Sequence, residues 1–450
     1  MDHDLNLETL AVVSACVVVW GLVSARLERW DVSAPIAFVV LGLVVTHGPT
    51  EIIHFNLHSN TVRSLAELTL ALVLFADASR VNVRLLRASA ALPARMLGIG
   101  LPLTIAAGAL TAALLFAGSG LWVAAAIGAI VAPTDAALGA SIMGDERVPS
   151  GVRRLINVES GLNDGIATPF VNLFVAGAAT TEAVKGTTHL VSAVVELVGG
   201  VALGLAVGIV GAVLLALARR TNWSSPGFRP LAILALALFA YSISIVAGAN
   251  GFIAAFVGGM AFGTVDAHND EAALRFTEEG GTLLSLLVWF VFGAVMLVPG
   301  LHDAGWRDVV FAVLALTLLR MGPVALSLVG SGLDRVTVLF VGWFGPRGLA
   351  SVVFGLLAVD ALAPAESKTV LAAVTLTIAL SVLLHGVSAS PLASRYGAYA
   401  AALGPRGPAH SEAVPITTRT LRRVGPPLSR RAAPPPAGGA HEPPPGPRGA

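Results

Sequence analysis

Long apolar stretches separated by short polar segments recur along almost the whole chain and predict membrane-spanning helices. A helix needs roughly 20 apolar residues to cross the hydrocarbon core of a bilayer, and most of these stretches approach or exceed that length. Thirteen spans can be placed. They lie near residues 9–24, 34–46, 62–79, 95–117, 121–143, 151–177, 189–218, 230–247, 250–264, 281–299, 309–329, 335–359 and 368–388. The pattern therefore predicts an all-α polytopic membrane protein.

The basic residues between the spans predict an orientation. Arginines gather in the loops that follow odd-numbered spans and in the segment after the last span, whereas the loops after even-numbered spans hold few basic residues. The exceptions are Lys185, Arg307 and Lys368. Because basic loops stay on the cytoplasmic side, we expect an N-terminus outside and a C-terminus in the cytoplasm, in the cell (inner) membrane.

Composition supports the membrane class and separates one segment from the rest. Only 12% of the 450 residues are charged and 55% are hydrophobic, whereas soluble domains carry about 25% charged residues. The single cysteine excludes an intramolecular disulfide. Residues 395–450 are rich in Pro, Gly, Ala and Arg, a composition that cannot bury enough apolar surface to fold. We therefore expect a transmembrane domain at 1–394 and a disordered cytoplasmic tail at 395–450.

Two of the predicted spans contain a proline beside an ionisable residue. Span 121–143 contains Ala132-Pro133-Thr134-Asp135, and span 335–359 contains Gly345-Pro346-Arg347-Gly348. A proline in mid-membrane interrupts a helix. The two spans are seven apart and so run in opposite directions. Matching interrupted helices in inverted halves indicate the binding site of a secondary transporter, so we expect inverted repeats whose two interrupted helices cross.

The hexad Glu159-Ser-Gly-Leu-Asn-Asp164 lies inside span 151–177, where carboxylates are costly unless they have a partner, a water-filled cavity or a function. Residues four apart share a helix face, so Ser160 and Asp164 point together and offer oxygen ligands for a small alkali cation. Glu159 and Asn163 share a neighbouring face. The alternative is a buried polar network that only holds helices together.

Asp135 and Thr134 are the second pair of candidate ligands. An interrupted helix frees main-chain carbonyls that can join a cation shell, and these two side chains add oxygen atoms. Both residue types also favour the N-cap of a helix, here that of the second half of the same span. The two interpretations are compatible, because a capped break can form part of a cation site.

The remaining deep charges are expected to form ion pairs. Arg347 needs a counter-charge, and Glu159 is the expected partner, which leaves Asp164 to titrate. Glu67 and Arg320 are expected to pair with each other and to serve structure. Small residues at 200, 204 and 208 predict close helix packing, within or between subunits. A histidine at 385 is interpreted as a buried core group without an assigned role.

These motifs resemble those of the NhaP-like Na⁺/H⁺ antiporters of the monovalent cation:proton antiporter family, which includes the animal sodium/proton exchangers. The matching segments are 67–75, 132–135, 159–165, 251–256, 345–348 and 385–386. The resemblance implies a homodimer with a scaffold and a six-helix core built from spans 4–6 and 11–13. It also implies Na⁺ binding by Asp164, Asp135, Ser160 and Thr134, with Glu159 paired to Arg347. Pro133 and Pro346 depart from the usual motifs, which affects the shape of the crossing.

Together, the residues and the resemblance predict a transporter that exchanges Na⁺ or Li⁺ for H⁺ by competition at Asp164. Another subgroup of this antiporter family carries a second aspartate at the position of Asn163, which is neutral here. With a single titrating carboxylate, we expect one cation to exchange for one proton, which is electroneutral. K⁺/H⁺ or broad monovalent exchange uses the same residues and is the main alternative. A membrane-embedded enzyme is a remote one, because the common hydrolase and nucleotide-binding motifs are missing. We expect no cofactor and no nucleic-acid partner.

Overall fold

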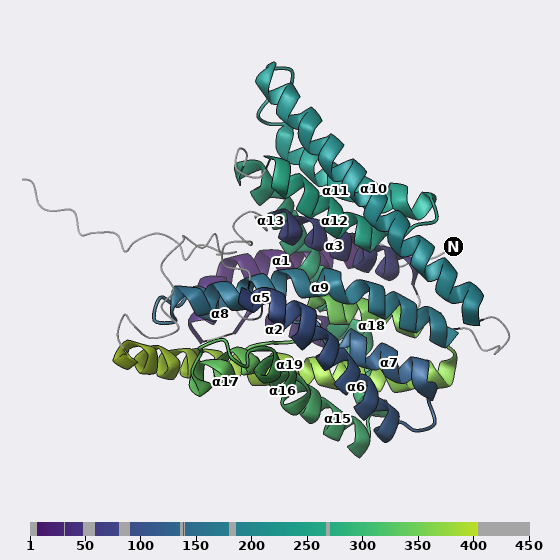
Figure 1. Ribbon diagram of the computed structural model, residues 1–450, viewed down its shortest axis with the longest axis vertical. Coiled ribbons are helices and arrows are strands. Elements are labelled where there is room, and N and C mark those ends of the chain that lie inside the picture. Colours follow the sequence, from purple (N-terminus) through teal and green to yellow (C-terminus); the bar gives the residue numbers. More distant parts are fainter. Residues whose placement is uncertain are drawn as a thin grey trace, which may run out of the picture. The chain divides into compact units, whose positions relative to one another are not determined.

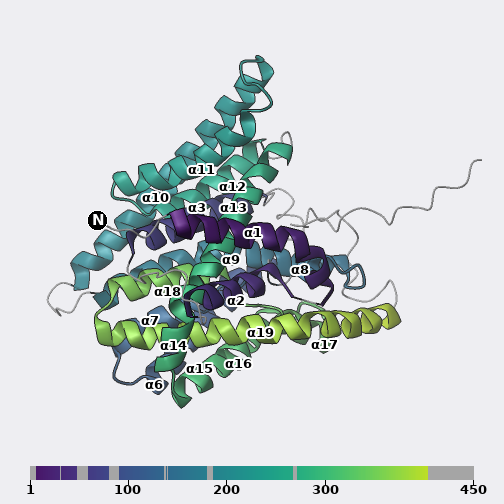
Figure 2. The same cartoon turned by 180° about the vertical axis from the view of Figure 1, so that it is seen from behind.

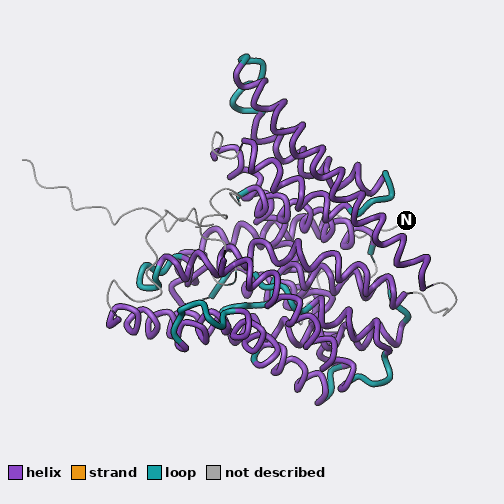
Figure 3. Tube along the Cα trace, viewed as in Figure 1, coloured by secondary structure: helices purple, strands orange, loops and turns teal. Residues whose placement is uncertain are grey.

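The computed structural model describes residues 7–30, 32–47, 59–80, 91–135, 138, 140–179, 186–266 and 271–403. Their secondary-structure elements are all helices, joined by turns and loops, and no strand occurs among them (Figures 1 and 3). The elements are α1 (Leu7–Leu27), η1 (Glu28–Trp30), α2 (Ala34–His47), α3 (Asn60–Ser79), α5 (Ala91–Arg95), η2 (Met96–Gly100), α6 (Leu101–Leu115), α7 (Gly120–Ile130), α8 (Ala140–Met143), α9 (Ser150–Ala179), α10 (Gly186–Arg220), α11 (Arg229–Val246), α12 (Gly251–Asp266), α13 (Glu271–Val291), η3 (Phe292–Met296), α14 (Leu297–Asp303), α15 (Trp306–Leu316), α16 (Leu318–Ser327), α17 (Arg335–Trp343), α18 (Leu349–Ala361) and α19 (Pro364–Leu403).

Each predicted span overlaps at least one helix among the described residues. Within the described residues, seven helical segments are long and apolar enough to cross a membrane, and four apolar helices are shorter. The long segments are Leu7–Trp30, Ala91–Leu115, Val191–Arg220, Arg229–Val246, Ala273–Asp303, Trp306–Ser327 and Pro364–Leu403. The all-helical membrane class is therefore confirmed, while the count of thirteen membrane crossings stays a prediction.

Three of the predicted spans are broken into two helices. The two breaks expected from proline lie between α7 and α8 and between α17 and α18, and they contain Pro133 and Pro346. A third, not expected from the sequence, separates α15 from α16 at Thr317, whose φ of −114° and ψ of −94° are not helical. These breaks expose main-chain groups in the middle of otherwise apolar spans.

Glycines allow α10 and α12 to pack closely, as the small-residue stripe predicts. A Cβ atom at Gly200 would lie 2.7 Å from the carbonyl oxygen of Asn250, and one at Gly204 would lie 2.6 Å from that of Ala254. Gly208 meets the main chain of Gly258 in the same way. Both views of the ribbon show these helices side by side (Figures 1 and 2). The stripe therefore serves packing within one chain.

The last described helix, α19, runs past the boundary expected at residue 394. It continues to Leu403, and Tyr396 stacks on Phe340 of α17 with ring centroids 4.0 Å apart. The alanine-rich sequence of residues 398–402 favours a helix, and this aromatic contact holds it in place. Residues 404–450, most of the expected disordered tail, lie outside the described residues.

Candidate cation-binding site

The breaks that contain Pro133 and Pro346 are joined directly by hydrogen bonds. The main-chain N–H of Asp135 donates to the carbonyl of Pro346 at 2.8 Å, and the N–H of Leu349 donates to Asp135 Oδ2 at 3.2 Å. The Ser351 hydroxyl donates to the carbonyl of Ile130 at 2.7 Å. Asp135 thus caps the N-terminus of α18, where the helix dipole favours a negative charge. The expected cap was that of the second half of the same span, whereas the helix that Asp135 contacts here belongs to the other interrupted span.

The two glycines that flank Arg347 allow this close approach. A Cβ atom at Gly348 would overlap the side chain of Asp135. A Cβ atom at Gly345 would lie 2.5 Å from Arg320 Nε and 2.9 Å from the Thr134 methyl group. The Gly-Pro-Arg-Gly segment therefore has glycine at the two positions where the side chains of Asp135, Arg320 and Thr134 come close to its backbone.

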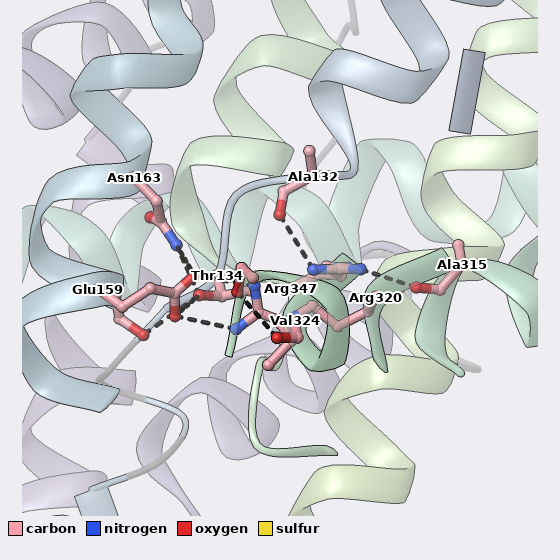
Figure 4. A network of polar contacts seen from close by, with 10 residues as sticks. Ala132, Thr134, Glu159, Asn163, Ala315, Arg320, Val324 and Arg347 are labelled. Carbon is pink, nitrogen blue, oxygen red and sulfur yellow. Dashed lines mark hydrogen bonds and ion pairs between the residues drawn. The ribbon is translucent and has the colours of Figure 1, made fainter. Parts of the chain in front are cut away.

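Thr134 lies at the centre of a buried polar network with the hexad (Figure 4). Asn163 Nδ2 donates to Thr134 Oγ1 at 2.6 Å, and the hydroxyls of Thr134 and Ser160 are 3.2 Å apart. Thr134 Oγ1 also lies 3.3 Å from Glu159 Oε2. None of the four side chains is more than 4% exposed. The structure therefore brings Thr134 and Ser160 together, as the sequence predicts.

Asp164 lies one turn further along α9 than Ser160, on the same face, and is partly buried. Its main-chain carbonyl accepts a hydrogen bond from Thr168 at 2.8 Å. The next residue, Gly165, has no room for a Cβ because the ring of Phe256 on α12 packs against it. The matched segments 159–165 and 251–256 therefore form one helix–helix contact.

Glu159 pairs with Arg320, which corrects both expected ion pairs. Arg320 Nη1 and Nη2 lie 2.8 and 2.9 Å from the two oxygens of Glu159, and the two residues are 2% and 1% exposed. Arg320 therefore does not pair with Glu67, and Glu159 does not pair with Arg347. The break at Thr317 explains the difference, because α16 starts there as a separate helix that carries Arg320.

Arg347 is held by main-chain carbonyls. Its Nη1 donates to Ala132 at 3.1 Å and its Nη2 to Ala315 at 2.7 Å (Figure 4). Ala315 lies in the last turn of α15 and Ala132 two residues after α7, where helices leave unpaired carbonyls and a partial negative charge. Among the described residues, Arg347 forms no ion pair. This arrangement could not be predicted from the sequence, because every residue carries a main-chain carbonyl that can act as an acceptor.

Glu67 belongs to a separate cluster on α3. It accepts from Arg63 Nε at 2.8 Å and from the hydroxyl of Tyr241 at 2.9 Å. Arg63 also contacts Asp360, at the C-terminal end of α18, at 2.7 Å. The Arg63 side chain is 52% exposed, so this cluster is far more open than the Thr134 network. Its expected structural role is compatible with these contacts, but its partners differ from those expected.

Comparison with known proteins supports the resemblance. Residues 12–395 match the family model described as "Sodium/hydrogen exchanger, transmembrane". A probable Na⁺/H⁺ antiporter of Schizosaccharomyces pombe is 30% identical over 52% of this chain and 32% of its own length. The K⁺/H⁺ antiporter NhaP2 of a Shewanella species is 25% identical over 76% of this chain and 58% of its own length. The chain thus spans about a third to three fifths of these relatives.

A solved structure shares the fold. The sodium proton antiporter MjNhaP1 from Methanocaldococcus jannaschii at pH 8 matches with a TM-score of 0.68 and 19% sequence identity, over 87% of this chain and 100% of the other. The relatives and this neighbour are antiporters, which are transporters and not enzymes. The match to the family model covers most of the chain. The chain therefore belongs to the family of transmembrane sodium/hydrogen exchangers.

Proposed function

We propose that this protein exchanges a monovalent cation, Na⁺ or Li⁺, for a proton across the membrane, with Asp164 as the carboxylate that binds either ion. The observation that carries this proposal is the pairing of the Thr134 and Ser160 hydroxyls, 3.2 Å apart, at a helix break inside the region that matches the exchanger family. Hydroxyl, carbonyl and carboxylate oxygens suit alkali cations, which prefer hard ligands.

The residues of the site take different roles in this proposal. Thr134 supplies a ligand from the break between α7 and α8, Ser160 and Asp164 supply ligands from α9, and Asp135 adds negative charge while it caps α18. Glu159 is fixed by two hydrogen bonds to Arg320 and so stays out of the ion cycle.

The cycle rests on competition at one carboxylate. A proton and a cation exclude each other at Asp164, because ligation of a cation displaces the proton. The core, formed by α5–α9 and α15–α19, then moves relative to the remaining helices of a homodimer and opens the site to the other side. Because Asn163 is neutral, Asp164 is the one carboxylate that exchanges ions, and one cation replaces one proton in each cycle. Each unit of pH difference contributes about 1.4 kcal/mol to the driving force.

K⁺/H⁺ exchange is the alternative that a specific observation favours. The similar Shewanella protein is a K⁺/H⁺ antiporter, and it aligns with 76% of this chain. The same oxygen ligands accept Na⁺, Li⁺ and K⁺. Selectivity among these cations depends on the size of the coordination shell in the occupied site. Measurement of proton flux with each cation decides which of them is exchanged.

The first experiment measures proton flux in everted vesicles on addition of Na⁺, Li⁺ or K⁺. We expect flux with Na⁺ and Li⁺ in the wild-type protein and none in Asp164→Asn, which keeps the size of the side chain but cannot titrate. Asp145→Asn makes the same change in the loop before α9 and is the control for the loss of a carboxylate, with its loss of stability, outside the ion site. Cation-dependent flux in the folded Asp164→Asn variant would overturn the role of Asp164.

A second experiment tests the stoichiometry. In proteoliposomes with fixed ion gradients, electroneutral exchange is expected to run at the same rate when the membrane potential is clamped at different values. A rate that changes with potential at constant gradients indicates net charge movement in each cycle and contradicts one-for-one exchange.

In the first experiment, flux with K⁺ and none with Na⁺ would favour K⁺ as the exchanged cation.

A further inference from the structure

Helix α19 places three polar side chains, Ser381, His385 and Ser388, against the α17–α18 break. Their spacing of four and three residues puts them on one face of the helix. The main-chain N–H of Arg347 donates to Ser381 Oγ at 2.7 Å. The indole Nε1 of Trp343, the last residue of α17, donates to Ser388 Oγ at 3.0 Å.

His385 holds the end of α17 from the middle of this face. Its ring is 2% exposed and stacks on the Trp343 indole, with centroids 5.0 Å apart and an interplanar angle of 27°. Its Nε2 lies 2.9 Å from the Trp343 carbonyl oxygen. That oxygen is one of the carbonyls left unpaired by the helix, and its other contact is the N–H of Gly345 at 2.8 Å.

Both ring nitrogens lie 2.9 Å from a carbonyl oxygen, but only Nδ1 also has a hydroxyl partner that can donate to it, so the contacts favour the tautomer with the proton on Nε2. A carbonyl oxygen can only accept a hydrogen bond. An unprotonated Nε2 would therefore place two acceptors 2.9 Å apart with no hydrogen between them. Nδ1 faces the hydroxyl and the carbonyl oxygens of Ser381, at 3.2 and 2.9 Å. A neutral ring accepts there from the hydroxyl, and a protonated ring donates to the carbonyl. In both states Nε2–H remains bonded to Trp343.

We propose that His385 is a positioning residue for cation exchange, whose Nε2–H donor fixes the α17–α18 break relative to the ion site. The break contains Pro346 and Arg347, which bond to Asp135 and to the carbonyl of Ala132 on the other break. A shift of the α17 end therefore moves the groups that define the site. This inference rests on the proposed exchange function, and it gives a role to the residue that sequence analysis left unassigned.

The test compares two amides of different length. In His385→Gln, the amide N–H reaches the position of Nε2, whereas in His385→Asn it reaches only that of Nδ1. We expect His385→Asn to raise the cation concentration for half-maximal exchange about threefold to tenfold, the worth of one hydrogen bond, with a maximal rate within about twofold. His385→Gln is expected to stay within about twofold of the wild type in half-maximal cation concentration and in maximal rate. Ser388→Ala is the control, because it removes a contact to the indole but leaves the Trp343 carbonyl bonded.

A second readout needs no transport. Amide hydrogen exchange of the peptide covering residues 340–350 is expected to be faster in His385→Asn than in His385→Gln or the wild type. Equal behaviour of the two amides in half-maximal concentration and in hydrogen exchange overturns the inference, as does a loss of cation affinity in His385→Gln alone. A wild-type protein without cation-dependent proton flux refutes the proposed function instead, and the hydrogen-exchange comparison then still tests the contact.

Discussion

Removal of one partner from the buried Glu159–Arg320 pair is expected to destabilise the protein strongly. In Arg320→Met, the Glu159 carboxylate stays buried at 1% exposure and keeps contacts only with Thr134 and Asn163, at 3.3 Å each. A buried charge without its partner costs about 3–5 kcal/mol of unfolding free energy. Glu159→Gln leaves Arg320 uncompensated in the same way. The double variant removes both charges and leaves neither uncompensated, so it is expected to lose no more stability than either single variant, which is a coupling of about 3 kcal/mol or more.

The assay is a double-mutant cycle of unfolding free energies, measured by denaturant titration in detergent micelles. The matched cycle combines Glu159→Gln with Arg347→Met, which replaces the arginine that forms hydrogen bonds only to carbonyls. We expect a coupling below about 1 kcal/mol there, because the two residues share no ion pair. A larger coupling with Arg347 than with Arg320 would refute the assignment of Arg320 as the partner of Glu159.

Further predictions concern packing and pH. Gly348→Ala places a Cβ against Asp135 and is expected to lower exchange or expression sharply. Gly161→Ala, whose Cβ would have nothing within 4 Å, should gain about 0.5–1 kcal/mol of helix stability. Thermal unfolding and flux measurements on the two variants test this pair. Hydrogen bonds from Arg147 hold the pKa of Asp145 below its usual 3.8. Because folding lowers this pKa, the contribution to stability is present above pH 3.8 and is lost as the pH falls through the lower folded pKa. Asp145→Asn should therefore be less stable than the wild type at pH 7 and equal to it in strong acid, and a difference independent of pH would contradict the assignment.

The helices and two of the three breaks could be predicted because their causes are local. Apolar stretches require helices in a bilayer, and Pro133 and Pro346 cannot continue one. The break at Thr317 has no such signal, because the nearest proline, Pro323, lies inside α16. That break sets where Arg320 points, so its absence from the prediction led to the wrong partner for Glu159.

Of the candidate site, the grouping was predictable and the pairing was not. Spacing places Ser160 and Asp164 on one face, and the approach of Thr134 was implied by the family resemblance. Which arginine meets which acceptor depends on the three-dimensional register of separate helices. It also depends on peptide groups, which every residue carries and no sequence pattern distinguishes.

The carbonyl groups around Arg347 differ from a carboxylate partner in two practical respects. Peptide oxygens do not titrate, so the counter-charge of this arginine is the same at every pH at which a proton-coupled protein works. Nor does a side-chain substitution at Ala132 or Ala315 delete the acceptor, because it belongs to the main chain. The arginine itself is thus the only member of this contact that a point mutation can remove, and its two direct hydrogen-bond acceptors are the same at any pH.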